Sequence, residues 1–72
     1  MHFQRTIKQL KDRRDALLVT QEMLADISGV SLRALKQFES GKGNPTLETL
    51  SKLADALGME VTLKVKTPPQ LD

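Results

Sequence analysis

The residues of this chain with the clearest chemistry are long polar side chains spaced to share one face of a helix. Arg33, Gln37 and Ser40 follow one another at intervals of four and three, and Lys36 flanks them. Arginine donates two hydrogen bonds to O6 and N7 of guanine, and glutamine pairs in a similar way with N6 and N7 of adenine. A helix that presents these side chains together can read base edges in a DNA major groove. Leu32 precedes them and either packs at the edge of the core or touches a thymine methyl group.

Two short helices joined by a tight turn would hold this face outward. In the stretch 21–41, QEMLADISGVSLRALKQFESG, Leu24 and Ala25 supply a core side chain and a small residue where two helices touch. Gly29 closes the first helix in a left-handed conformation, and Ser31 caps the second with its hydroxyl. The buried face is completed by Val30, Leu35 and Phe38. Since this unit carries a helix into the major groove, it favours DNA contact over the solvated helix face that each polar residue alone would indicate.

Residues at the two ends of this stretch are candidates for contacts with phosphate. Gln21 stands at the amino end of the first helix, where backbone N–H groups and a side-chain amide can meet a phosphate oxygen. Lys42 and the backbone amides of Gly43 and Asn44 can hold phosphate on the other side. The alternatives are an ordinary surface glutamine and an ordinary turn lysine.

Two opposite charges occupy positions that the helical pattern assigns to the core. Arg14 lies on the apolar stripe of a helix predicted over residues 3 to about 17, and Glu39 follows Leu35 by four residues. The other members of the stripe are Phe3, Ile7, Leu10, Leu17 and Leu18. Because a buried charge needs a partner, we predict an ion pair between Arg14 and Glu39 that clamps the first helix to the recognition helix. The alternative is that both side chains reach water separately.

The remaining helices follow from capping residues and apolar spacing. Thr20 is the predicted cap of the second helix, and Thr46 caps a fourth helix that Gly58 ends. Its apolar residues repeat at three and four: Leu47, Leu50, Leu53, Ala54 and Leu57. The predicted fold class is all-α, a compact bundle of four to five short helices over residues 1–58.

After this bundle the apolar period changes to two. Met59, Val61, Leu63 and Val65 alternate with polar residues, which predicts a β-strand over residues 59–66. A lone strand cannot satisfy its hydrogen bonds, so the expected partner is the same strand of a second copy across a two-fold axis. Two consecutive prolines stop the strand, and a flexible tail is expected over residues 67–72.

Composition narrows the classes of function. The chain has 72 residues, no cysteine and a single histidine, His2, so it offers no disulfide and no zinc cluster, and we predict neither metal nor cofactor. Asp12/Asp15 and Glu22/Asp26 are interpreted as solvated pairs, and without a catalytic constellation the chain is not expected to be an enzyme. No apolar run reaches the roughly 20 residues of a membrane span and no signal peptide is visible, so we expect a cytoplasmic protein without a membrane partner.

The distribution of charge is more informative than the net charge of +2. Basic residues gather in the first segment and around the recognition helix: Arg5, Lys8, Lys11, Arg13, Arg14, Arg33, Lys36 and Lys42. Such grouping is typical of a surface that attracts nucleic acid, although a solvated surface explains the first segment equally well.

Several short motifs together resemble the Cro/lambda-repressor-type helix-turn-helix family, also called the xenobiotic-response-element family. They are Thr20-Gln21, Ala25, Gly29-Val30-Ser31, Phe38-Glu39-Ser40-Gly41 and residues 44–50, NPTLETL, and the resemblance covers about residues 5–58. It implies a lambda-repressor-like DNA-binding domain with a salt bridge between Arg14 and Glu39. It also implies phosphate contacts at Gln21, Ser40 and Lys42 and base contacts at Leu32, Arg33, Lys36 and Gln37. Leu32 departs from the polar base reader that the family often has there. With the capping and loop positions, the candidate DNA-contacting residues are Gln21, Ser31, Leu32, Arg33, Lys36, Gln37, Ser40, Lys42 and Asn44.

A second, weaker resemblance to HipB-like antitoxins depends on residues 59–66 and on the length of the chain. It implies a repressor of its own operon that also binds a kinase-like toxin. The leading hypothesis is therefore a homodimeric, sequence-specific and autoregulating repressor of transcription that binds double-stranded DNA at a palindromic operator through helix 31–40. The alternative is an antitoxin or adaptor whose main role is to bind a protein partner.

Overall fold

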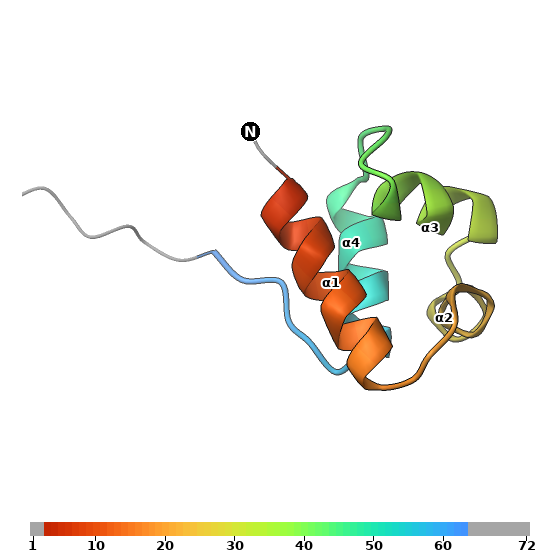
Figure 1. Cartoon of the computed structure of the whole chain (residues 1–72). Helices are drawn as coiled ribbons and strands as arrows, with labels where there is room; N and C mark the ends of the chain where they lie inside the picture. The colour runs from red at the N-terminus through yellow and green to blue at the C-terminus, as the bar shows by residue number, and fades with distance from the viewer. Residues whose placement is uncertain (1–2, 64–72) are drawn as a thin grey trace, which may run out of the picture.

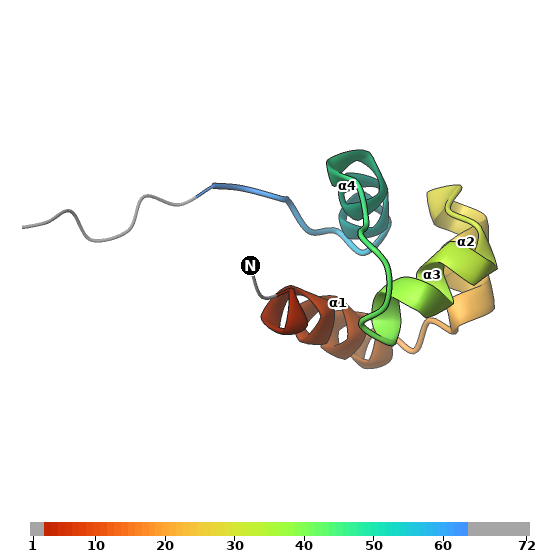
Figure 2. The same cartoon turned by 90° about the horizontal axis from the view of Figure 1, so that it is seen from above.

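The computed structural model describes residues 3–63, and this part of the chain forms four helices and no strand (Figure 1). Their bounds are α1 Gln4–Ala16, α2 Gln21–Ser28, α3 Leu32–Glu39 and α4 Leu47–Ala56. Helix α2 packs against both α3 and α4, and α1 packs against α3. In both views α2 and α3 lie together on one side of α1 and α4, and the chain after α4 leaves on the opposite side (Figures 1 and 2). The all-α prediction is confirmed for these residues.

Three helices begin at the hydroxyl caps that the sequence predicts. The side chains of Thr20, Ser31 and Thr46 each accept a hydrogen bond from the backbone N–H three residues later, at 3.1, 3.1 and 3.0 Å. Such a bond satisfies one of the donors that a helix leaves free at its amino end. Gly29 ends α2 with a φ of +76°, as predicted from the left-handed turn.

The core lies where the four helices meet. Its buried residues are Leu10, Leu24, Val30, Leu35, Phe38, Leu53, Ala54 and Leu57. This set includes the residues predicted for the buried face of the helix-turn-helix. Leu47 departs from the prediction, because it stands at the first position of α4 and 69% of its surface is exposed. The apolar spacing of α4 is therefore confirmed from Leu50 onward and wrong for its first turn.

The predicted apolar stripe of the first helix is wrong at its end. Helix α1 ends at Ala16, and Leu17 and Leu18 are exposed. Leu18 has a φ of +58°, so the rotation of roughly 100° per residue that would carry these side chains to the core stops before it. Phe3 and Ile7, by contrast, are half-buried.

The segment after α4, residues 59–63, leads away from the bundle and forms no strand (Figure 1). The backbone N–H of Met59 donates to the carbonyl oxygen of Ala54 at 2.8 Å, and its side chain packs against the core. Val61 and Leu63 are exposed. An isolated strand has no ladder to join within one chain, so pairing with a second copy stays a prediction. Val65 and the predicted tail 67–72 lie outside the described residues.

Candidate nucleic-acid interface

Helix α3 is amphipathic, and its buried and exposed faces are those that the sequence predicts. Leu35, Phe38 and Glu39 are buried, and the opposite face is exposed. That exposed face carries Arg33, Lys36 and Gln37, with Ser40 directly after the helix and the half-buried Leu32 at its first position. No ion pair engages Arg33 or Lys36 within residues 3–63. The structure therefore brings the five predicted side chains together along one accessible side of α3.

Two candidate residues on α3 already make local hydrogen bonds. The Ser31 hydroxyl accepts from the backbone N–H of Ala34 at 3.1 Å, and the Ser40 hydroxyl donates to the carbonyl oxygen of Gln37 at 2.9 Å. Because the Ser31 oxygen only accepts in this bond, its hydroxyl hydrogen can still donate to an acceptor outside the chain. Ser40 must instead rotate its hydroxyl, or offer its backbone, to donate to a phosphate.

The cap at Ser31 gives a measurable prediction. Replacing Ser31 with alanine removes the acceptor for the Ala34 N–H and is expected to lower the free energy of unfolding by about 1 kcal/mol. Urea unfolding followed by circular dichroism measures this change. Ser31→Asn is the control, since asparagine also caps helices, and an alanine variant as stable as the wild type would contradict the role of the hydroxyl.

The loop after α3 carries the predicted phosphate contacts Lys42 and Asn44, both of them exposed. Gly41 and Gly43 have φ values of +80° and +77°, which turn the chain sharply at the carboxyl end of α3. The backbone N–H of Lys42 donates to the carbonyl oxygen of Gln37 at 2.9 Å, so the loop is tied to the end of α3.

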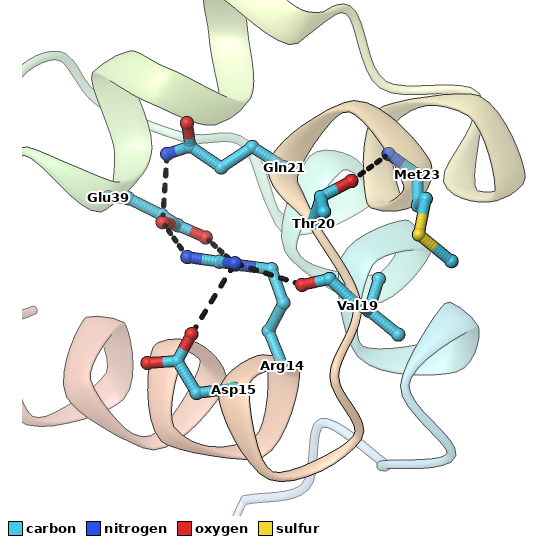
Figure 3. A network of polar contacts seen from close by, with 7 residues as sticks. All are labelled: Arg14, Asp15, Val19, Thr20, Gln21, Met23 and Glu39. Atoms are coloured by element: carbon cyan, nitrogen blue, oxygen red, sulfur yellow. Dashed lines mark hydrogen bonds and ion pairs between the residues drawn. The ribbon is translucent and has the colours of Figure 1, made fainter.

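Behind α3, Arg14 and Glu39 form the predicted ion pair. The Arg14 Nε and Nη2 atoms donate to the two carboxylate oxygens of Glu39 at 2.8 and 2.9 Å, and Nη1 donates to the carbonyl oxygen of Val19 at 2.9 Å (Figure 3). Only 13% of the Arg14 side chain and 5% of the Glu39 side chain are exposed. The hydrogen bonds to Glu39 raise the pKa of the Arg14 guanidinium, and burial opposes this shift. A two-pronged bond of this kind fixes both distance and orientation, so it holds α1 against α3.

Gln21 belongs to the same network, and the sequence does not predict this contact. Its amide Nε2 donates to Glu39 Oε1 at 3.0 Å, so the side chain turns toward the ion pair (Figure 3). Its predicted contact with phosphate would therefore use the second amide hydrogen or the backbone N–H at the first position of α2. Gln21 thus joins the amino end of α2 to α3, and the sequence has no spacing signal that would indicate this contact.

Part of the basic first segment has a structural use. The Arg13 Nε atom donates to the carbonyl oxygen of Leu57 at 3.0 Å, which ties α1 to the end of α4. Lys8 pairs with Asp12 at 2.8 Å on the surface of α1. Arg13 therefore has a structural role, and Lys8 belongs to a solvated surface.

The sequence that forms these helices matches a known protein family. The sequence model of the helix-turn-helix family matches residues 10–63, which include the whole of α2, α3 and α4. The chain belongs to the Cro/C1-type helix-turn-helix family. The resemblance found in the sequence is thereby confirmed, and α2 and α3 are the two helices of the helix-turn-helix motif.

Curated relatives of this helix-turn-helix chain are named as regulators of transcription. It is 44% identical over 54 residues to the cryptic phage CTXphi transcriptional repressor RstR of Vibrio cholerae, covering 75% of this chain and 48% of that protein. It is 39% identical over 57 residues to an HTH-type transcriptional regulator of Haemophilus influenzae, covering 79% and 58% of the two chains. The SPbeta prophage-derived HTH-type transcriptional regulator YonR of Bacillus subtilis is 33% identical over 66 residues, covering 90% and 61%. The chain thus spans about half to three fifths of the length of these relatives.

No group of three or more histidine, cysteine or acidic residues within residues 3–63 is placed to hold a metal ion. No helix in the same range is long and apolar enough to cross a membrane. The exposed side of α3, with the loop that follows it, is the candidate functional site.

Proposed function

We propose that this chain is a sequence-specific regulator of transcription that binds double-stranded DNA by inserting α3 into the major groove. The observation that carries the proposal is the polar side of α3, which is exposed while the opposite side is packed and clamped by the Arg14–Glu39 pair. Membership of the helix-turn-helix family and the names of the relatives support it. Because Arg33 and Gln37 have the donors and acceptors that distinguish guanine and adenine, α3 supplies direct readout.

The proposed contacts divide into base and phosphate contacts. Bases are contacted by the exposed polar side of α3 and its first residue: Leu32, Arg33, Lys36 and Gln37. Phosphates are contacted from the two flanks of the motif by Gln21, Ser31, Ser40, Lys42 and Asn44. Phosphate contacts fix the position of the domain on the duplex, and base contacts select the sequence.

The proposed assembly is a homodimer on a palindromic operator. Two copies of α3 would enter successive major grooves about 34–36 Å apart, which is one turn of B-form DNA. The predicted partner surface is the alternating segment that begins at Met59, in which Val61 and Leu63 are exposed in the single chain. Pairing of this segment across a two-fold axis would cover both side chains.

The proposed biological role is repression of the chain's own promoter, in the cytoplasm. The phage and prophage regulators among the relatives, one of them named a repressor, favour this role over that of an antitoxin. An antitoxin or adaptor that binds a kinase-like toxin stays a prediction from the weaker resemblance.

Fluorescence anisotropy with the upstream promoter fragment and a scrambled duplex, at two salt concentrations, tests the proposed DNA binding. We expect the promoter fragment to bind about a hundredfold or more tightly than the scrambled duplex, with a preference that persists at the higher salt, because base contacts depend less on released counterions than phosphate contacts do. Equal and strongly salt-dependent binding to both duplexes would contradict sequence-specific regulation.

Deletion of residues 60–72 tests the proposed dimer. This deletion leaves Met59 on the core and removes the alternating segment, so the protein is expected to become monomeric and to bind its operator about tenfold or more weakly. Sedimentation equilibrium gives the mass, and anisotropy gives the affinity. A deletion variant that stays dimeric would refute pairing through this segment.

A further inference from the structure

A groove with a volume of about 760 Å³ lies between α1 and the loop that follows α3. The wall formed by α1 includes residues spaced by four, three and four along the helix: Gln4, Lys8, Lys11 and Asp15. The opposite wall includes Ser40, Gly41 and Asn44. In both views the carboxyl end of α3 lies beside α1, and the loop begins there (Figures 1 and 2). The groove therefore adjoins the loop that is proposed to contact phosphate.

Lys11 is a basic residue of this groove whose charge has no ionic partner among residues 3–63. It is half-buried in the groove wall, so its ammonium group lies close to the facing loop. Lys8, nearly one turn earlier on α1, already binds the carboxylate of Asp12 at 2.8 Å. Because a lysine ammonium has several hydrogen-bond donors and no acceptor, Lys11 can bind an anion that enters the groove.

The acidic residues along the groove do not exclude an anion, because basic side chains lie against them. The carboxylates of Asp12 and Glu39 are each bound by a basic side chain at 2.8 Å, and that of Asp15 lies 3.5 Å from Arg14 Nη1. Opposite charges at such distances cancel much of each other's field in the space beside them. The charge of Lys11 is left to attract an anion.

The facing loop offers hydrogen-bond donors that the fold leaves free. Within residues 3–63, the backbone N–H groups of Gly43 and Asn44 donate to no protein acceptor, and both residues are exposed. A Cβ atom on Gly41 would meet nothing within 4 Å beyond its chain neighbours, so the space beside the loop is open. Free backbone N–H groups in a tight turn form concave sites for anions. Donors from the loop and the ammonium of Lys11 thus face the same groove.

We propose that Lys11 contacts a phosphate of the DNA backbone across this groove, together with the loop after α3, so that α1 extends the DNA interface beyond the helix-turn-helix motif. This inference rests on the proposed binding of double-stranded DNA and adds a contact from a residue outside that motif. Lysine binds phosphate as a compact charge on a flexible stem. Since every DNA sequence has the same phosphates, the contact strengthens binding to all duplexes and selects none.

The substitution Lys11→Gln tests this contact in the full-length chain. Glutamine keeps a polar side chain and removes the charge, so one counterion fewer is released on binding. The slope of log affinity against log salt is expected to fall by about one in magnitude, for the promoter fragment and for a scrambled duplex alike. At the lower salt concentration, both duplexes are expected to bind about fivefold or more weakly. Lys11→Arg keeps the charge and is expected to preserve the wild-type slope. Fluorescence anisotropy at a series of salt concentrations measures these changes.

Lys52→Gln is the matched control, because it removes the same charge from α4, outside the groove. It is expected to leave the salt slope unchanged. If Lys11→Gln lowers the slope no more than Lys52→Gln does, or if Lys11→Arg loses the slope as well, the inference is wrong. A loss confined to the promoter fragment would also overturn it, since Lys11 would then contact a base.

Failure of this inference and failure of the proposed function give different results in these titrations. A wild-type chain that prefers the promoter fragment keeps the proposed function, whatever Lys11→Gln does to the slope. A wild-type chain that binds both duplexes equally loses sequence specificity, and a lower slope in Lys11→Gln would still support the phosphate contact. A wild-type chain that binds neither duplex would overturn both.

Discussion

Replacing Glu39 with alanine is expected to lower the free energy of unfolding by about 3–5 kcal/mol, the range for breaking a buried ion pair by removing one partner. Arg14, with 13% of its side chain exposed, would lose the acceptor of its Nε and Nη2 donors. Gln21 would lose the acceptor for its amide at the same time. The charge on Arg14 cannot be lost to relieve the burial, because an arginine guanidinium stays protonated in proteins.

Urea unfolding followed by circular dichroism measures this loss, and a surface ion pair provides the matched control. Asp12→Ala breaks the Lys8–Asp12 pair, whose side chains are 76% and 62% exposed, and is expected to leave the free energy of unfolding nearly unchanged, because water screens an exposed pair. The double variant Arg14→Met with Glu39→Ala is expected to recover part of the loss, since no unpaired charge remains. A Glu39→Ala variant as stable as Asp12→Ala would mean that water replaces the carboxylate and that the pair is no clamp.

The Arg14–Glu39 pair is also the clearest case in which the sequence alone predicts a tertiary contact. Each residue interrupts an apolar stripe, and a buried charge requires its opposite. The chain offers one such arginine and one such glutamate on the stripes of two different helices, so the pairing follows. The hydroxyl caps and the left-handed Gly29 are predictable for a similar reason, because few residue types satisfy those positions.

Contacts with backbone acceptors and with shared partners cannot be predicted in this way. Arg13 donates to the carbonyl oxygen of Leu57, and every residue in the chain offers such an oxygen. Gln21 shares a carboxylate that already has a stronger partner. The exposure of Leu17 and Leu18 could not be predicted for another reason: leucine favours helix continuation, and its residue type does not indicate the left-handed φ of +58° that Leu18 adopts after α1.

The strand predicted over residues 59–66 depends on a partner, so a single chain cannot test it. Alternation of Met59, Val61 and Leu63 describes a segment with one face to bury, and in the structure only Met59 packs against its own core. The exposed remainder of the segment requires a partner that the sequence does not contain. For the same reason the exposed side of α3 could be predicted, while an operator sequence could not, since it depends also on how the duplex deforms.

The sharpest test of that side of α3 is Arg33→Ala. Arg33 is exposed and free of ion pairs within residues 3–63, so its guanidinium can donate to O6 and N7 of a guanine. Loss of such a contact is expected to cost about 1–3 kcal/mol on the preferred operator and to relax the choice of base at one position of each half-site. Binding to unrelated duplexes is expected to change much less.

Lys42→Ala is the matched control for this prediction, because Lys42 is an exposed basic residue in the loop after α3 and is proposed to contact phosphate. It is expected to weaken binding to all sequences alike and to reduce the slope of log affinity against log salt by about one. Anisotropy titrations of both variants against the operator, single-base operator variants and a scrambled duplex separate the two effects. If Arg33→Ala weakens every duplex equally and changes the salt slope as Lys42→Ala does, Arg33 contacts phosphate, and the selection of bases must come from Gln37 and the remaining residues of α3.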